Sequence, residues 1–506
     1  MTCASDRMRV PVARVLLVLV VVGLGTACGT DAVGTERTTF YQDVAPILAD
    51  HCMTCHQDGG IAPFALTDYE SARDNSERML AEIERGAMPP FDAREEPECT
   101  PRFGWVDDPR LSETELQTLQ QWVEDGHPEG TITEVPPIPN TDLSNSDMTL
   151  VPAEGWATSG TVDQYVCYVL DPGNTELEWL SGLQVRPGND VVVHHAVVTE
   201  LRAGAATDQF VNDHGIGKPF ECINSNGLTN GDDPDAPKPE AFIVHTWTPG
   251  SQPMQTSGDI AIPVFDHAKL VVQIHYHPAG LAHEPDVTSV DLRFSKTWPI
   301  KMYFVALLGN AKGAPDLLPD PDDSSADVPQ FTIPKNVADH HEHMRFALGS
   351  KLDELGDDVR LFSVTPHMHM IGTHLSAKIE RPSARGDDPQ TECLANGTWD
   401  FDWQRTYTYD ASLDQLPSVA NGDIIDIDCA WNNTADNANV QRMLEDNGRD
   451  EVFDVKLGEQ TVDEMCLEIF GVSVDAPLEP VSGMPAKIEF PSSVSQLNSH
   501  PAASAR

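Results

Sequence analysis

Apolar and polar positions recur with two different periods along this chain, and the change of period divides it. Between residues 38 and 130 the apolar residues recur at helical spacing, which predicts one helix over 43–56 and a second over 71–85. A third helix is expected to begin at Ser112, because Ser112 and Glu115 have the spacing of a capping box. The first part of the chain is therefore predicted to be a small all-α domain.

A stretch rich in Pro, Thr and Asn follows, and residues 131–154 are interpreted as a linker. Beyond it, short segments alternate between apolar and polar residues and are separated by Gly, Pro, Asn and Asp, which is typical of strands. No long helical pattern intervenes, so we expect an all-β antiparallel region long enough for two sandwich domains. The clearest predicted strands cover residues 190–199, 269–276, 359–365 and 423–430.

The N-terminus carries the pattern of an export signal. Arg7, Arg9 and Arg14 precede an apolar run over residues 15–24, which is too short to span a bilayer. Small residues then lead to Cys28, as at a bacterial lipoprotein cleavage site. We expect a signal peptide over 1–27, a lipid on Cys28, a tether over 28–37 and a disordered tail over 491–506. Periplasmic secretion without a lipid anchor is the alternative to an outer-membrane or periplasmic lipoprotein.

Residues 52–56 read Cys-Met-Thr-Cys-His, the pattern that attaches a c-type haem. The thiols of Cys52 and Cys55 would bond the haem vinyl groups, and His56 would be the proximal iron ligand. A zinc half-site or a redox-active thiol pair is the alternative, but the next cysteine, Cys99, stands alone. Met88 lies in a Pro-bounded loop and is the predicted distal ligand. Residues 38–130 therefore resemble a small class I cytochrome c.

The charge of the chain limits its partners. Asp and Glu total 80 against 32 Lys and Arg, a formal net charge of −48. This argues against nucleic acid or anionic lipid as a binding partner. It predicts a strongly solvated acidic surface.

Histidines cluster on the predicted strands. His367 and His369 are two residues apart, and such a pair on a strand points to one face. His194 and His195 are adjacent, so both can reach one metal only at a bulge or a strand end. His275 lies on a third predicted strand. Imidazoles suit copper, zinc, iron and nickel, and a thioether added to the set favours copper.

Four motifs in order carry a family resemblance: His194-His195, a Gln-Ile-His-Tyr segment that contains His275, His367-Met-His369, and Asp-Glu-Met465-Cys. Over about residues 155–490 the chain resembles the copper type II, ascorbate-dependent monooxygenases, which include the peptidylglycine α-hydroxylating and dopamine β-monooxygenases. The resemblance implies two antiparallel, jelly-roll-like sandwich domains, 155–305 and 306–490, each with one copper ion.

The resemblance also implies the ligands. One electron-transfer copper would be held by His194, His195 and His275. A second, catalytic copper, at which O2 is activated, would be held by His367, His369 and Met465. Disulfide bonds are implied between Cys167 and Cys222 and between Cys429 and Cys466, whereas Cys99 and Cys393 have no assigned partner.

Two positions depart from the peptide-amidating members of that family. Thr365 stands where those members carry an Arg for the substrate carboxylate, and Ile469 stands where they carry a Tyr. Peptidylglycine is therefore not the expected substrate. The cluster at residues 340–343, His-His-Glu-His, lies outside the matched motifs and is predicted to be a solvated segment rather than a metal site.

Together these features predict an exported copper monooxygenase that hydroxylates a C–H bond of an unidentified small molecule or peptide with O2. An external donor would supply electrons through the haem. A copper and haem electron-relay protein without turnover is the alternative, and an oxygen reductase lies between the two. In a third interpretation the cytochrome docks another redox protein and the β region is structural.

Overall fold

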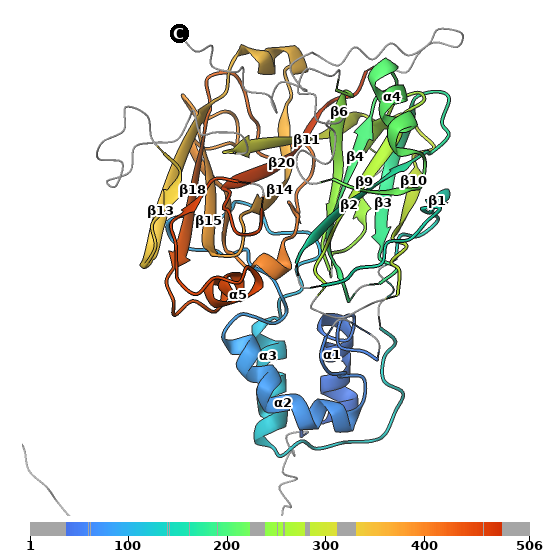
Figure 1. Ribbon diagram of the computed structural model, residues 1–506. Coiled ribbons are helices and arrows are strands. Elements are labelled where there is room, and N and C mark those ends of the chain that lie inside the picture. The colour runs from blue at the N-terminus through green and yellow to red at the C-terminus, as the bar shows by residue number, and fades with distance from the viewer. Residues whose placement is uncertain are drawn as a thin grey trace, which may run out of the picture.

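The computed structural model describes residues 37–477, apart from residues 59, 61, 139, 141, 161, 190, 223–237, 250, 257–258, 279–283, 311–329 and 459. The predicted signal peptide, Cys28 and the predicted tail lie outside the described residues. The described chain is mostly β, with several antiparallel sheets and a few short helices (Figure 1). No helix among the described residues is both long and apolar enough to cross a membrane.

The helical part contains a short turn η1 (Phe40–Val44) and helices α1 (Ala45–His51), α2 (Tyr69–Glu84) and α3 (Glu113–Glu124). The capping box predicted at the start of α3 is present: Ser112 accepts from the backbone N–H of Glu115, and the Glu115 side chain accepts from that of Ser112. Phe40 and Trp122 are fully buried between the helices. Figure 1 shows the three helices together at one end of the β strands.

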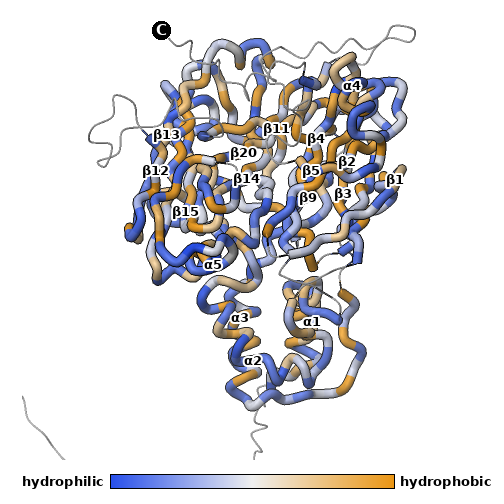
Figure 2. Tube along the Cα trace, viewed as in Figure 1, coloured by the Kyte–Doolittle hydropathy of each residue, from blue (hydrophilic) through white to orange (hydrophobic). Residues whose placement is uncertain are grey.

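The N-terminal β region (residues 148–294) consists of two facing layers. Its core is made of apolar side chains from both layers. Hydrophobic residues occur along the strands of both layers (Figure 2). One layer runs in the order β5 (Pro219–Glu221), β2 (Gln164–Leu170), β9 (Lys269–Tyr276), β4 (Val193–Leu201) and β6 (Ala241–Trp247); the other comprises β1 (Met148–Leu150), β10 (Ser289–Phe294), β3 (Glu178–Arg186) and β8 (Ile260–Val264), with β7 (Met254–Gln255) beside β3.

The C-terminal β region (residues 301–475) repeats the two-layer arrangement. Its core is larger and includes aromatic and methionine side chains from both layers. One layer runs in the order β13 (Val337–Ala347), β18 (Ile424–Asn433), β15 (Gly372–Glu380) and β16 (Thr391–Thr398); the other in the order β11 (Lys301–Gly309), β20 (Leu467–Asp475), β14 (Arg360–His367) and β17 (Tyr407–Thr408), while β12 (Thr332–Ile333) pairs with β19 (Val455–Lys456).

The two β regions share one sheet. Strand β8 of the N-terminal region pairs in parallel with β11, with Ile260 opposite Lys301 and Ala261 opposite Met302. This pairing joins the layer that contains β8 to the layer that contains β11, which makes one nine-stranded sheet. The expected domain boundary at 305/306 falls inside β11, which pairs along its whole length with β20 of the C-terminal region.

Residues 91–107, which the sequence analysis placed with the helices, pack into the C-terminal β region. Phe91, Ala93 and Trp105 are buried in its core. A disulfide bond joins Cys99 to Cys393 of β16, two cysteines that the sequence left unpaired. The helical part is therefore connected to the C-terminal region by a covalent cross-link as well as by the chain.

The histidine cluster at 340–343 is an ordered strand, so the expectation of a solvated segment was wrong for half of it. It lies on β13, where His340 and Glu342 are buried and the alternate residues His341 and His343 face outwards. His341 pairs with Asp428 and His343 with Asp426, both on the neighbouring β18. Two helices, α4 (Ala205–His214) and α5 (Ala438–Asp446), also lie where only strands were expected.

Candidate metal and haem centres

The haem motif forms the turn that follows α1. Cys52 and Cys55 are free thiols, and burial raises the pKa of Cys52 to about 12. The Nδ1 of His56 lies 3.0 Å from the carbonyl oxygen of Phe64, and burial lowers the pKa of the His56 ring. A neutral imidazole with Nδ1 bonded in this way directs the Nε2 lone pair to a metal. The donor set therefore fits a covalently attached haem.

Met88 lies on the segment that leaves α2. Its backbone N–H donates to the carbonyl oxygen of Glu82 at 3.2 Å, and its side chain is half-buried. Two residues on, the carbonyl oxygen of Pro90 accepts from Nη1 of Arg405 at 3.1 Å. The charge of Arg405 also opposes the burial that raises the pKa of Cys55. The haem motif and the segment after Met88 thus approach the same guanidinium.

His194, His195 and His275 meet at the end of β4 and β9. His195 and His275 lie directly opposite each other in the antiparallel register, and the register shifts between Val193 and His195. This irregularity lets the His194 side chain lie on the same face as that of His195, as shared metal binding by adjacent histidines requires. The Nδ1 of His195 lies 3.2 Å from that of His194 and 3.3 Å from that of His275. Their ligand atoms lie within 4.8 Å of one another.

Carboxylates contact the outer nitrogens of this histidine triad. Asp163 Oδ2 lies 3.0 Å from Nε2 of His275, and Asp402 Oδ1 lies 3.4 Å from Nε2 of His194. Burial lowers the pKa of His275 to about 4 and holds that of His195 well below its usual range. A neutral imidazole whose Nε2 faces a carboxylate, as at His275, presents its Nδ1 lone pair inwards, which is the arrangement of a metal site with an ordered outer partner.

His367 and His369 lie at the end of β14 and just beyond it, with their ring centres 5.4 Å apart. Nδ1 of His367 lies 2.9 Å from Oε1 of Gln404, and Nδ1 of His369 lies 3.0 Å from the carbonyl oxygen of Asp463. Burial lowers both pKa values, that of His369 to about 3. Both rings are therefore oriented through Nδ1.

Met465 lies on the loop that leads into β20 and is 8% exposed. Leu467, two residues later, is paired with His367 in the register of β14 and β20. The Glu464 carboxylate accepts from the backbone N–H groups of His369 at 2.8 Å and Met465 at 3.3 Å. The structure therefore brings this loop to the histidine pair and ties both to one carboxylate.

Three disulfide bonds are present among the described residues. Cys429 of β18 is bonded to Cys466, the residue after Met465, and Cys167 of β2 is bonded to Cys222. These are the two pairs that the resemblance implies. The third, Cys99–Cys393, joins residues 91–107 to β16.

The two histidine sets lie close to each other. The charges of His367 and His369 contribute to lowering the pKa of His195, after burial and the nearer histidines. Thr461, four residues before Met465, donates its hydroxyl to Asp163 Oδ2 at 2.9 Å. Asp163 therefore contacts the triad and the loop of the second set.

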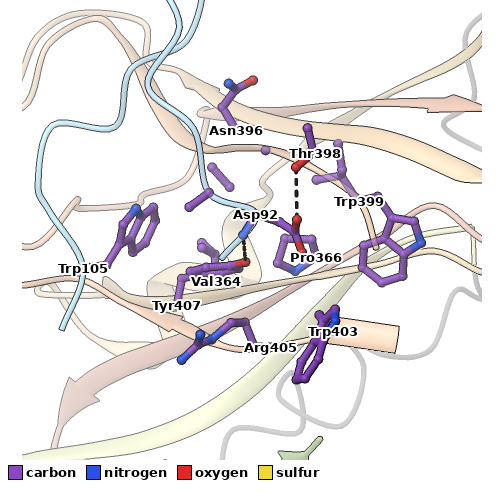
Figure 3. A pocket seen from close by; sticks show the side chains of 14 residues that line it. Asp92, Trp105, Val364, Pro366, Asn396, Thr398, Trp399, Trp403, Arg405 and Tyr407 are labelled. Carbon is purple, nitrogen blue, oxygen red and sulfur yellow. Dashed lines mark hydrogen bonds between the residues drawn. The ribbon is translucent and has the colours of Figure 1, made fainter. Parts of the chain in front are cut away.

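A pocket opens beside the second set, between residues 92–105 and the C-terminal β region (Figure 3). Asp92 makes two of its polar contacts: the backbone N–H donates to the Tyr407 hydroxyl at 3.1 Å, and the carboxylate accepts from Thr398 at 3.1 Å. Burial raises the pKa of Asp92 to about 6. The remaining lining is mainly apolar and aromatic and includes Trp105, Pro366, Trp399 and Trp403.

Sequence reasoning missed the residues that orient the ligands. Asp163, Asp402 and Gln404 contact ligand rings, but each stands in a loop or short turn without periodicity. Glu464 lies in the Asp-Glu-Met-Cys motif, so that motif could have identified it as a residue that orients the ligands. The sequence gives no signal that 399–405 approaches both histidine sets.

Comparisons with known proteins leave the family open. No family model matches the chain, and no curated protein matches it. Among solved structures, a chain from the atomic structure of broad bean stain virus is 8% identical, covers 69% of this chain and 98% of its own length, and has a TM-score of 0.23. The structure of PNGF-II is 7% identical with a TM-score of 0.24, covering 67% of this chain and 66% of its own.

Proposed function

We propose that this chain is a copper-dependent monooxygenase that receives electrons through a covalently attached haem c. The observation that carries the proposal is the convergence of three histidine Nδ1 atoms beside a second set of two histidines and a methionine loop. Two sites of different donor chemistry at the meeting of two β regions match the arrangement that the family resemblance implies. The proposed fold is a cytochrome c-like helical domain followed by two jelly-roll-like copper sandwiches.

The proposed roles follow from the donor atoms. His194, His195 and His275 would bind one copper ion through imidazole nitrogen alone. His367, His369 and Met465 would bind the other, and the thioether favours the reduced ion. The copper ions would supply O2 reduction, with one oxygen atom inserted into a substrate C–H bond and the other released as water.

The chain's own residues hold these ligands in place. Asp163 and Asp402 fix the outer nitrogens of the triad, and Glu464 fixes the backbone at His369 and Met465. Cys52, Cys55 and His56 would attach the haem, with Met88 as the distal ligand. The export signal and the disulfide bonds favour an extracytoplasmic lipoprotein, because disulfides persist in oxidising compartments.

The substrate is proposed to be uncharged near the reacting carbon. Thr365 and Ile469 are directly paired across β14 and β20, and Thr365 lies two residues from His367 on the same face of its strand. The Thr365 hydroxyl bonds that of Thr406 at 2.7 Å. A neutral pair at this place offers no positive charge for a carboxylate, which supports a substrate other than peptidylglycine.

The test is coupled O2 consumption by the holoprotein with labelled O2 and candidate substrates, with product identified by mass spectrometry. The variant Met465→Leu is expected to abolish labelled product while copper remains at the triad. Met443→Leu changes a buried methionine of α5 in the core of the same β region; it is the matched control and is expected to keep activity. O2 uptake that never yields labelled product, or full activity in Met465→Leu, contradicts the proposal; uptake without product favours the electron-relay alternative.

A further inference from the structure

One short segment of the C-terminal β region, residues 399–405, contacts both histidine sets and the chain two residues after Met88, the proposed distal haem ligand. It reads Trp-Asp-Phe-Asp-Trp-Gln-Arg and contains the single turn η4 (Phe401–Trp403). We call it the junction segment. The inference below rests on the proposed function, because it concerns how electrons would pass between the haem and the copper sites.

The junction segment holds the second histidine set from both of its ends. The indole Nε1 of Trp399 donates to the carbonyl oxygen of His369 at 2.8 Å. Oε1 of Gln404 lies 2.9 Å from Nδ1 of His367. Each proposed ligand histidine of this set is therefore one hydrogen bond from the segment.

The middle of the junction segment faces the triad. The Phe401 ring stacks on the His194 ring with centres 4.9 Å apart and planes 24° apart. Asp402 Oδ1 lies 3.4 Å from Nε2 of His194. The triad thus meets the segment through one histidine, by an aromatic stack and a carboxylate.

The last residue of the junction segment faces the haem side. Nη1 of Arg405 donates to the carbonyl oxygen of Pro90 at 3.1 Å, and the guanidinium lies 5.3 Å from the centre of the Phe91 ring. Pro90 lies two residues after Met88, the proposed distal ligand of the haem. Figure 3 shows Arg405 on the same side of the pocket as Trp403.

The segment is fixed in place rather than free to swing. Asp400 accepts from the backbone N–H of Asp402 at 3.0 Å and caps η4. The side-chain amide of Gln404 donates to the carbonyl oxygen of Phe401 at 3.2 Å, and its backbone oxygen accepts from the Thr248 hydroxyl of the N-terminal region. Gln404 is 7% exposed. Phe401 is 6% exposed. Rigid, desolvated contacts at these two residues would lower the reorganisation that accompanies charge movement.

We propose that the junction segment is the electron bridge of this protein, from the haem edge through Arg405 and Gln404 to His367, with a branch through Phe401 to His194. Each passage would move one electron: a bound haem iron would be oxidised from Fe(II) to Fe(III), and a bound copper ion would be reduced from Cu(II) to Cu(I). An external one-electron donor restores the haem. Arg405 and Gln404 are covalent neighbours, so the route to the second set contains one peptide unit between its two polar contacts.

The test measures the rate of electron transfer from the haem rather than the rate of substrate turnover. Holoprotein with Fe(III) and Cu(II) is reduced at the haem by a flash-excited soluble ruthenium photosensitiser. Haem reoxidation is then followed by its visible absorbance, and copper reduction by loss of the Cu(II) paramagnetic signal. Arg405→Met is expected to slow reoxidation by about tenfold, the effect on a rate of losing a charge-assisted contact.

Arg449→Met is the matched control, because Arg449 also lies over a phenylalanine ring, 4.1 Å from the centre of Phe453, on another part of the same region. It should leave the rate unchanged. Arg405→Lys keeps the charge and is expected to recover part of the rate, which separates a bridge from a folding defect. Phe401→Leu is expected to slow reduction of the triad copper alone.

Unchanged reoxidation in both Arg405 variants, with normal haem spectrum and copper content, overturns the bridge. A slowed rate without any hydroxylated product in the parent protein supports the bridge and contradicts the proposed oxygenase. A holoprotein that binds no haem or no copper overturns both.

Discussion

The two histidine sets are built in different ways. In the triad, His195 and His275 are register partners on β4 and β9, so strand pairing alone fixes their spacing. In the second set, His367 ends β14, while His369 and Met465 lie in loops that the Glu464 carboxylate joins. The triad is a product of sheet register, whereas the second set depends on cross-links between loops.

This difference separates a site in which two of three ligands are register partners from one in which two of three ligands lie in loops held by specific contacts. A register is determined along the whole strand, so a single outer substitution leaves it intact. Loop ligands move when one cross-link is removed, and here the cross-links are Glu464 and the Cys429–Cys466 bond. The donor sets differ as well, since only the second set contains a thioether, which favours Cu(I).

The largest expected effect breaks the triad itself. His275→Gln removes one of three nitrogen ligands and is expected to lower copper binding from two ions to one per chain. His245→Gln is the control, because His245 lies in the same sheet on β6 and burial likewise lowers its pKa to about 4. Copper analysis with paramagnetic resonance measures the outcome. Equal copper content in both variants would place the first site elsewhere.

Removing disulfide bonds should distinguish the two regions. The double variant Cys429→Ala, Cys466→Ala is expected to lower the free energy of unfolding by about 2–4 kcal/mol and to weaken copper at the second set. Cys167→Ala, Cys222→Ala should cost a similar free energy but leave the second copper unchanged, because that bond lies in the N-terminal region. Denaturant titration and Cu(I) affinity give both quantities. Weakened second-site binding in both double variants would refute the local role of Cys429–Cys466.

A smaller effect is expected from Asp163, which contacts the triad through His275 and the second loop through Thr461. Asp163→Asn should weaken copper at the triad by about 10–100-fold, the usual effect of losing an outer partner of a ligand histidine. Asp171→Asn removes a surface carboxylate paired with Lys269 and serves as the control. Competitive chelation measures the affinities, and parity between the two variants would deny Asp163 this role.

The smallest expected effect concerns pH and the N-terminal region alone. Burial raises the pKa of Glu200 from 4.5 to about 8. The hydrogen bond from the Phe265 N–H and the charge of Arg202 partly oppose this rise. The folded protein therefore holds this proton more tightly, and the free energy of unfolding falls as pH rises from 4.5 to 8. Between pH 7 and pH 8 the loss is about 1 kcal/mol. In metal-free protein, Glu200→Gln should flatten this slope; an unaltered slope would rule Glu200 out as its source.

Local patterns predicted much of the fold. Alternation over 269–276 gave β9 with both ends correct, and the Ser112 capping box marked the start of α3. The adjacent histidines required an irregular strand, and the register shift at His194 provides it. These features depend on residues that are close together in the sequence, so a local sequence pattern is enough to predict them.

Features that depend on partners far away in the chain could not be predicted from the sequence. Residues 91–107 lack a clear period, yet Phe91 and Trp105 pack in the C-terminal core, and Cys99 bonds Cys393 across 294 residues. The alternation of β13 was overlooked because two of its four buried positions are the polar residues His340 and Glu342. Tertiary contacts made both segments part of the core.

The contrast between an all-nitrogen site and a thioether site is tested most directly by X-ray absorption at the copper edge of the fully reduced, copper-loaded protein. Two coppers per chain are expected, with sulfur scattering equivalent to about one ligand for every two coppers. That sulfur contribution should vanish in Met465→Leu and persist in Met443→Leu. Spectra without sulfur, or with sulfur that survives in Met465→Leu, would contradict the assignment of the second site.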